Sequence, residues 1–343
     1  MKSAVFYGKE DLKIENSDMP EIKPEDVLIR VHACGICGTD IHIFDGDEGA
    51  AATPTGTILG HEFAGEVVGI GDAVEEVKIG DRVCVDPNKL CGKCSFCRNG
   101  KGHFCTKMIG IGTTVNGGFS EYCSVPVSQV YKFSDNITYA QAAMTEPVAC
   151  CLHGIDMCNL KHGDTVAIIG AGMIGLIMLQ LVRLGGAKRI IVFEPIEEKR
   201  RIAEKLGADL TIDPLNGQAN KMLIENGVDQ VDVVIECVGR TDTIEMGINI
   251  AGKGSTLMMF GLTKPDDVLG IKPFEIFKKE LVLKSSYINP YTQERALGLI
   301  DSGKIDVQSM IYRMISLNEL PKVLSDRKER SKGKYIVDPQ MNC

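Results

Sequence analysis

Short stretches of alternating hydrophobic and polar residues dominate the first 150 residues of the chain. Residues 27–31 and 66–69 are two such stretches, and the segments around them are rich in the Gly and Pro that are typical of turns. Successive short strands without intervening helical patterns favour antiparallel pairing. We therefore expect residues 1–150 to form a mainly antiparallel, barrel-like β domain.

The pattern changes after about residue 150, where strands alternate with helices. The apolar residues 166–169 predict a buried strand, and residues 173–184 have the length and composition of a helix. The other expected elements are strands at 189–193, 231–235 and 255–260 and a charged helix at 196–206. Such alternation is typical of a parallel sheet with helices on both faces. We therefore predict a doubly wound α/β domain over residues 151–287.

The last segment holds too few elements to fold alone. Residues 292–301 predict a helix and residues 335–337 a final strand. With 343 residues, the chain is long enough for two domains. We expect residues 288–343 to complete the β-rich domain, so that the α/β domain is an insertion in its sequence.

Composition narrows the possible partners. The formal net charge is −8 and no dense Lys/Arg run is present, which argues against nucleic acid as a partner. The N-terminal sequence has no extended apolar region, and the apolar stretch 173–182 is too short to span a membrane and contains Gln180. We expect a cytoplasmic protein that does not interact with membranes. The odd number of cysteines, 13, favours reduced thiols and metal ligands over disulfides.

Four cysteines follow the spacing C-x2-C-x2-C-x7-C, at Cys91, Cys94, Cys97 and Cys105. Tight turns allow thiolates at such short spacing to converge on one tetrahedral zinc ion. A shell of four cysteines leaves no open coordination position, so this zinc site should be structural. An iron–sulfur cluster needs similar ligands, and four unligated cysteines are a further alternative.

A second set of potential ligands consists of Cys37, His61, Glu62 and Glu146. Each of these residues alone would more often be a buried or solvated side chain without a metal. Together, one thiolate, one imidazole and one or two carboxylates form an incomplete shell that leaves room for water or substrate. The combination is that of a catalytic zinc site.

The segment from Gly170 to Gly175 reads G-x-G-x-x-G between an expected strand and an expected helix. Glycines there permit a tight turn and let the backbone approach a pyrophosphate at the N-terminus of the helix. The predicted dinucleotide-binding residues of this turn are Gly170, Gly172, Met173, Ile174 and Gly175.

Three further residues bear on the choice of dinucleotide. Glu194 follows Gly175 by 19 residues, where an acid can hydrogen-bond the ribose 2′-hydroxyl and repel a 2′-phosphate. NAD is therefore favoured over NADP, although Lys199 and Arg200 nearby argue the other way, and Lys199 could equally be a surface charge. Val238, after the strand at 231–235, is expected to face the ribose and nicotinamide side.

Three segments together resemble the zinc-containing medium-chain dehydrogenase/reductase family over essentially the whole chain. They are residues 35–42 (GICGTDIH), residues 60–67 (GHEFAGEV) and the four-cysteine segment. Residues 146–149 (EPVA), with Leu152 and His153 after them, are similar to the sorbitol and other polyol dehydrogenases. The resemblance implies a GroES-like mainly antiparallel catalytic domain, a Rossmann domain and a homo-oligomer, dimer or tetramer. It also implies that Cys37, His61 and Glu62 lie near the catalytic zinc, with Glu146 a direct or water-mediated ligand.

The expected reaction is oxidation of a secondary alcohol or polyol to a ketone, with hydride transfer to NAD. Zinc favours ionisation of a bound hydroxyl, and the resemblance implies a proton relay through Thr39 and His42. The alternatives are a helix N-cap role for Thr39 and an exposed helix position for His42. We expect two zinc ions per chain, one catalytic and one structural.

Substrate identity stays open at this point. L-threonine, butanediol and sugar phosphates are alternative substrates on such a scaffold, and Arg295 is a candidate phosphate ligand. Ile43, Phe44 and Phe119 could line a substrate pocket or belong to the core. A non-catalytic NAD-binding sensor is the alternative of a different class, and both metal sets argue against a zinc-free quinone reductase.

Overall fold

The computed structural model describes residues 1–47 and 52–341. The chain divides into two compact units, one of Met1–Ala149 with Asn289–Cys343 and the other of Cys150–Ile288. The second unit is thus inserted in the sequence of the first. The division falls within helix α4, Thr145–Cys158.

The first unit is mainly β. Its strands are β1 Lys2–Gly8, β2 Asp11–Asn16, β3 Asp26–Gly35, β4 Thr57–Ile58, β5 Glu62–Ile70, β6 Arg82–Val85, β7 Asn88–Lys89, β8 Ile109–Gly110, β9 Tyr122–Pro126, β10 Val130–Lys132, β17 Ile311–Ile315 and β18 Lys334–Val337. Its helices, besides the start of α4, are α1 Gly38–Asp45, α2 Ser95–Arg98, α3 Tyr139–Ala143, α10 Gln293–Asp301, α11 Leu320–Ser325 and α12 Arg327–Arg330.

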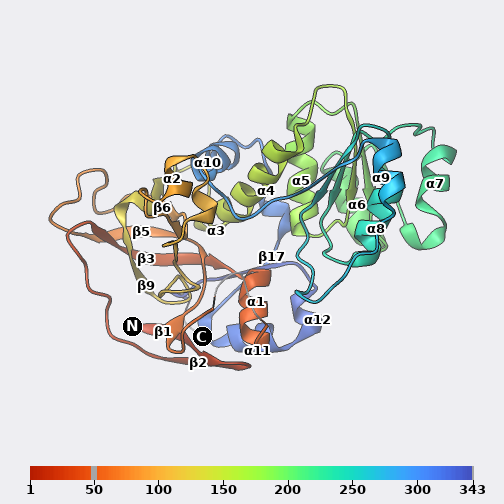
Figure 1. The fold of residues 1–343 in the computed structure, drawn as a ribbon. Helices are drawn as coiled ribbons and strands as arrows, with labels where there is room; N and C mark the ends of the chain where they lie inside the picture. The colour runs from red at the N-terminus through yellow and green to blue at the C-terminus, as the bar shows by residue number, and fades with distance from the viewer. Residues whose placement is uncertain (48–51, 342–343) are drawn as a thin grey trace. The chain divides into compact units, whose positions relative to one another are not determined.

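A seven-stranded sheet organises this unit. Its strands run in the order β10-β6-β5-β3-β18-β17, and β9 pairs with β3 outside this path. Most of the pairings are antiparallel, as expected, but β17 and β18 are parallel. Since β18 pairs with β3, the C-terminal segment lies beside the earliest strands, as the blue and red ribbons in Figure 1 show.

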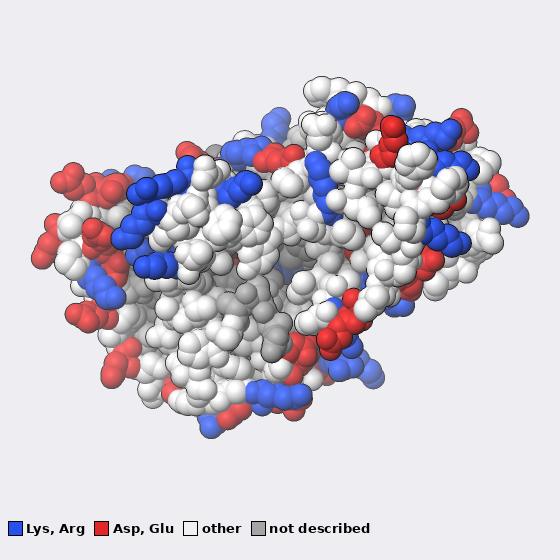
Figure 2. All heavy atoms as spheres, in the orientation of Figure 1, with Lys and Arg blue, Asp and Glu red and all other residues white. Residues whose placement is uncertain are grey.

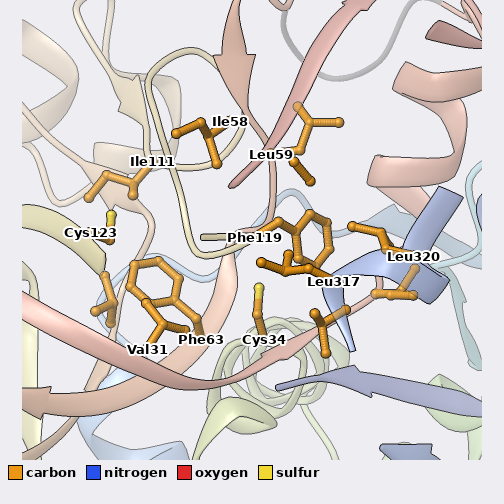
Figure 3. Close-up of a cluster of buried hydrophobic side chains, with 14 of the residues drawn as sticks. Val31, Cys34, Ile58, Leu59, Phe63, Ile111, Phe119, Cys123, Leu317 and Leu320 are labelled. Carbon is orange, nitrogen blue, oxygen red and sulfur yellow. The ribbon is translucent and has the colours of Figure 1, made fainter. Parts of the chain in front are cut away.

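Apolar side chains from both parts of the first unit form one core. Phe63 and Phe119 are 1% and 0% exposed, and Leu317 and Leu320 from the C-terminal segment pack in the same cluster (Figure 3). Burial of such apolar surface contributes roughly 25 cal/mol per Å² to folding. The C-terminal segment is therefore an integral part of this core.

The second unit is a six-stranded parallel sheet in the order β13-β12-β11-β14-β15-β16. The strands are β11 Thr165–Ile169, β12 Arg189–Phe193, β13 Leu210–Ile212, β14 Val233–Glu236, β15 Thr256–Met259 and β16 Val282–Ser285. The helices are α5 Met173–Leu184, α6 Glu197–Lys205, α7 Ala219–Glu225, α8 Thr241–Ile250 and α9 Pro273–Lys279. All residues of β11 are buried, because this central strand has neighbours on both edges and helices on its faces.

The structure confirms the expected two-part α/β architecture with an antiparallel β unit and a doubly wound unit. The predicted helix at 173–184 and strand at 189–193 have the bounds expected, and other boundaries shift by one to four residues. The stretch at 66–69 lies within the longer strand β5, and the strand expected at 231–235 begins only at Val233. In the described part of the chain, no helix combines the length and the hydropathy that crossing a membrane would require.

Candidate functional site

Cys37, His61 and Glu62 come together in the first unit. One ligand atom from each of these residues lies within 4.8 Å of those from the other two. His61 and Glu62 are 6% and 0% exposed, whereas Cys37 is half-buried. These sulfur, nitrogen and carboxylate oxygen donors could hold a metal ion, and an incomplete protein shell with one accessible side is what a catalytic metal site requires.

Two element boundaries position these ligands. Cys37 is the N-cap of α1, where it follows directly on the end of β3. Glu62 is the first residue of β5, and Gly35 and Glu62 are partners across the β3–β5 pairing. A Cβ atom at position 35 would lie 2.2 Å from the carboxylate of Glu62, so only glycine leaves room for that side chain.

Asp40 supports the same site from the first turn of α1. Its Oδ2 accepts a hydrogen bond from the backbone N–H of Cys37 at 2.8 Å, and its Oδ1 lies 3.3 Å from Nδ1 of His61. Burial would lower the pKa of His61, but the negative groups on Asp40 and Cys37 raise this pKa well above its usual value. A carboxylate behind a ligating histidine orients the ring and increases its basicity.

Lys334 is a site residue that the sequence did not indicate. It is 4% exposed on β18, its Nζ donates a hydrogen bond to Ile36 O at 2.8 Å, and it forms an ion pair with Oε2 of Glu62. Burial would lower the pKa of Lys334, but Glu62 and Cys37 raise it. The other carboxylate oxygen of Glu62, Oε1, is buried and has no hydrogen-bond partner among the residues that the structure describes. One oxygen is thus held by lysine, and the other could bind a metal ion.

Glu146 and the two expected relay residues take different positions. Glu146 is buried in the first turn of α4, but it is not part of the group formed by Cys37, His61 and Glu62. Thr39 is not the N-cap of α1, because Cys37 has that position; the Thr39 hydroxyl lies 3.8 Å from the Cys37 sulfur. His42 is partly exposed, and its Nδ1 lies 3.1 Å from Oδ2 of Asp47.

The residues considered for a substrate pocket belong to the core instead. Ile43, Phe44 and Phe119 are at most 5% exposed and pack in the hydrophobic cluster of the first unit. Their side chains are needed to fill that cluster. Arg295 lies on the exposed surface of α10.

The four cysteines of the second set also converge. The sulfur atoms of Cys91, Cys94, Cys97 and Cys105 all lie within 4.8 Å of one another. Backbone N–H groups point at three of these sulfurs, at 3.3 to 3.5 Å, and the one from Cys97 lowers the pKa of Cys94 to about 6. Donors arranged in this way stabilise thiolates, which are the form that binds zinc.

The Gly-rich turn of the second unit joins β11 to α5. Gly170 has φ +98° and lies against Val238, and a Cβ at Gly175 would come within 1.9 Å of the Gly170 carbonyl oxygen. Gly172 is the N-cap of α5, and a Cβ there would meet no atom of the described residues within 4 Å. The backbone N–H groups at the N-terminus of a helix can donate hydrogen bonds to a phosphate group, and the open space at Gly172 leaves room for one.

Glu194 follows β12 and contacts this turn directly. Its carboxylate accepts hydrogen bonds from the backbone N–H groups of Ala171 at 2.9 Å and Ile196 at 3.0 Å. Arg200 donates to the carbonyl oxygens of Glu194 and Pro195 and lies 3.6 Å from Asp213. Its guanidinium is therefore engaged within the protein. Lys199 is half-buried on α6, and Val238 is 44% exposed after β14.

Comparisons with known proteins agree with this arrangement. Residues 23–135 match the alcohol dehydrogenase GroES-like domain, and residues 174–302 match the zinc-binding dehydrogenase model. The chain is 35% identical to D-arabinitol dehydrogenase 1 of Uromyces fabae over 98% of this chain and 97% of that protein. It is 34% identical to L-threonine 3-dehydrogenase of Francisella philomiragia over 95% of both chains.

A solved structure gives the same result for the fold. A candidate zinc-binding dehydrogenase from Sinorhizobium meliloti 1021, bound to NADP, is 38% identical, with a TM-score of 0.95 over 98% of this chain and 99% of that one. Whole-length identity and both family models lead to one conclusion: the chain belongs to the zinc-containing medium-chain dehydrogenase/reductase family of oxidoreductases.

Proposed function

We propose that this protein oxidises a secondary alcohol of a polyol to a ketone and transfers the hydride to NAD. The observation that carries the proposal is the open, mixed ligand group of Cys37, His61 and Glu62, with a buried carboxylate behind it. A bound zinc ion would supply Lewis acidity toward the alcohol oxygen.

The residues present fit zinc. Oε1 of Glu62 is a buried acceptor to which no described residue donates a hydrogen bond, and a cation would satisfy it. Because Nδ1 of His61 faces Asp40, Nε2 is the ring nitrogen available to a metal. We propose Glu62 as the direct carboxylate ligand, with Glu146 acting through a water molecule. The four-cysteine group would hold a second, structural zinc.

The substrate proton needs a route to solvent. The Thr39 hydroxyl lies next to Cys37, and a hydroxyl can both accept and donate a proton. His42 is one helical turn further along α1, partly exposed and paired with Asp47. We assign Thr39 the inner position and His42 the solvent end of a relay.

The cofactor is held by the second unit. The turn from Gly170 to Gly175 would bind the pyrophosphate, with Met173 and Ile174 in the first turn of α5 and Val238 on the nicotinamide side. Glu194 lies where a ribose 2′-hydroxyl would bind, and its negative charge disfavours a 2′-phosphate. Although the similar Sinorhizobium structure was solved with NADP, Glu194 supports NAD here. Lys199 would be a further contact with the cofactor.

The proposed substrate class is based on the similarity of this chain to dehydrogenases of known name. Similarity to D-arabinitol dehydrogenase 1 supports a polyol, and similarity to L-threonine 3-dehydrogenase makes threonine the second candidate. Initial rates should be measured with D-arabinitol, sorbitol, xylitol, ribitol, 2,3-butanediol and L-threonine, each with NAD and with NADP. We expect the highest kcat/KM for a polyol with NAD; a clear preference for threonine would select the second candidate. No turnover with any substrate by the zinc-loaded protein would favour a non-catalytic NAD-binding role.

A further inference from the structure

Helix α1, which carries Thr39 and His42, is held at its C-terminal end by an ion pair with a distant part of the chain. Arg330 on α12 donates hydrogen bonds from Nη1 and Nη2 to the two carboxylate oxygens of Asp45, at 2.7 and 2.8 Å. The two residues are 285 positions apart in the sequence. Two parallel hydrogen bonds between a guanidinium and a carboxylate make a stronger and more specific contact than a single one.

Other contacts fix the position of Arg330. Its Nε donates to the carbonyl oxygen of Leu324, and its side chain is only 12% exposed. Helix α12 is in turn tied to β18, because the hydroxyl of the buried Tyr335 donates to the carboxylate of Glu329. The guanidinium of Arg330 is therefore directed at Asp45 by the fold of the C-terminal segment.

Asp45 lies beside His42, the residue that we assign to the solvent end of the proton relay. Residues three positions apart on a helix are neighbours on one face. The hydrogen bond from Arg330 lowers the pKa of the Asp45 carboxyl, burial opposes this shift, and the charge of nearby His42 supports it. The ionised Asp45 is thus within electrostatic reach of His42.

His42 itself is paired with a different carboxylate. Its Nδ1 lies 3.1 Å from Oδ2 of Asp47, and the Asp47 N–H donates to the His42 carbonyl oxygen at 2.8 Å. Acidic and basic side chains lie close together on the surface around α12, as Figure 2 shows in the orientation of Figure 1. The basic groups at this end of α1 are Lys9, whose side chain lies against Gly46, and Arg327 and Arg330 on α12.

A second carboxylate at His42 would impair a relay. Histidine serves there because it gains and loses a proton near neutral pH. A carboxylate without its own counter-charge stabilises the protonated ring, which cannot accept the proton of the alcohol. We propose that Arg330 is a positioning residue of the reaction, because its two-pronged pair with Asp45 keeps this carboxylate from capturing His42. The inference rests on the relay in the proposed function.

Two single substitutions break the same ion pair and separate this role from a purely structural one. Arg330→Gln leaves Asp45 charged and unpaired, whereas Asp45→Asn leaves no charge to compete for His42. Arg330→Lys keeps the positive charge, and a double variant combines Arg330→Gln with Asp45→Asn. Arg313→Gln is the matched control, because it breaks an exposed ion pair with Glu319 in the same C-terminal segment.

The measurement is the rate of NADH formation in the first turnover, followed by stopped-flow absorbance from about pH 6 to 10. It uses the zinc-loaded full chain and the best substrate of the panel above. Arg330→Gln should lower this rate about tenfold at pH 7 and shift its pH profile about one unit to higher pH. Asp45→Asn, Arg330→Lys and the control should stay within about twofold of wild type, and the double variant should regain the wild-type profile.

Equal losses in Asp45→Asn and Arg330→Gln, or a double variant that stays slow, would overturn the proposal. Both results would mean that the ion pair only holds the helix. The double variant lacks the same hydrogen bonds as Arg330→Gln, so a difference in rate between these two proteins does not come from lost stability. Zinc content and urea unfolding of each variant check that the compared proteins are folded and metal-loaded.

The variant His42→Gln distinguishes failure of this inference from failure of the relay. If His42→Gln is slow and Arg330→Gln is as fast as wild type, only the role of Arg330 is overturned. If His42→Gln is as fast as wild type at every pH, the relay is wrong and the role of Arg330 is overturned with it.

Discussion

Lys334 near the C-terminus and Glu62 at the start of β5 form an ion pair from which water is excluded, with side chains only 2% and 0% exposed. The two residues are 272 positions apart in the sequence. Their pairing ties the last strand of the first unit to the proposed metal ligand. It also fixes one carboxylate oxygen of Glu62, so that the other oxygen, which has no hydrogen-bond partner among the described residues, would be the one to bind the proposed metal.

Removal of one partner of this ion pair should lower the free energy of unfolding. Lys334→Met would leave the carboxylate of Glu62 buried without its counter-charge, and breaking such pairs costs about 3–5 kcal/mol. We expect the free energy of unfolding, measured in urea, to fall by about that amount. The double variant Lys334→Met with Glu62→Gln should recover most of the loss, because neither buried charge remains. If Lys334→Met alone unfolds at the wild-type urea concentration, the ion pair does not stabilise the fold.

The four-cysteine group should hold its metal independently. Cys97→Ser removes one of four converging sulfurs, so we expect the zinc content to fall from about two to about one per chain. Local order in residues 88–110 should be lost, whereas the metal proposed at Cys37, His61 and Glu62 should stay. Mass spectrometry under native conditions, combined with hydrogen exchange of residues 88–110, would detect both effects. Loss of both metals would show that the sites are coupled.

Asp86 should make stability depend on pH. Burial raises the pKa of Asp86 to about 6, although hydrogen bonds from Asn88 N–H and the Asn289 side chain oppose the shift. Because the folded-state pKa is above the unfolded one, the folded protein binds a proton that the unfolded chain releases between about pH 4 and 6. The contribution of the protonated Asp86 carboxyl group to the free energy of unfolding is fully present below this pH range. It is lost as the pH rises through 6.

The variant Asp86→Asn measures this effect. Asparagine keeps the acceptor oxygen for Asn88 without the buried charge. The variant should gain free energy of unfolding relative to wild type as the pH rises from 4 to 7, by up to about 3 kcal/mol. Urea unfolding of both proteins at several pH values gives the difference. A difference that does not change over this range would contradict the raised pKa.

Glu194 should set the preference between dinucleotides. Glu194→Ser removes the charge that would repel a 2′-phosphate, and it also removes the acceptor for the Ala171 N–H. We expect the ratio of kcat/KM for NADP to that for NAD to rise about tenfold or more, mainly through KM. Glu198→Ser, an exposed acid on α6, is a matched control that should leave the ratio unchanged. An unchanged ratio in Glu194→Ser would mean that other residues choose the cofactor.

Much of the fold could be predicted because its signals are local. The continuous apolar run of β11 and the glycines that follow it identify the parallel unit, and short alternating strands such as β3 identify the other. Thiol spacing likewise predicted that Cys91 and Cys105 converge, as they do. These features depend on residues close together in the sequence.

The remaining parts of the site depend on tertiary contacts. Lys334 looks like a surface lysine in a polar C-terminal stretch, and only the pairing of β18 with β3 places it beside Glu62. The sequence could not rank Glu62 against Glu146, because the distance to Cys37 is set by where β5 and α4 begin. Threonine is a common N-cap residue, which favoured Thr39 for that position, but the N-cap of α1 lies two residues earlier, at Cys37.

The central claim is that Cys37, His61 and Glu62 hold the metal on which turnover depends. The most direct measurement compares zinc content and NAD-dependent polyol oxidation in wild type and Cys37→Ala. We predict about two zinc ions per chain in the wild type and about one in the variant, with turnover lost and the four-cysteine site still loaded. Retained turnover in Cys37→Ala, or a full complement of zinc in that variant, would contradict it.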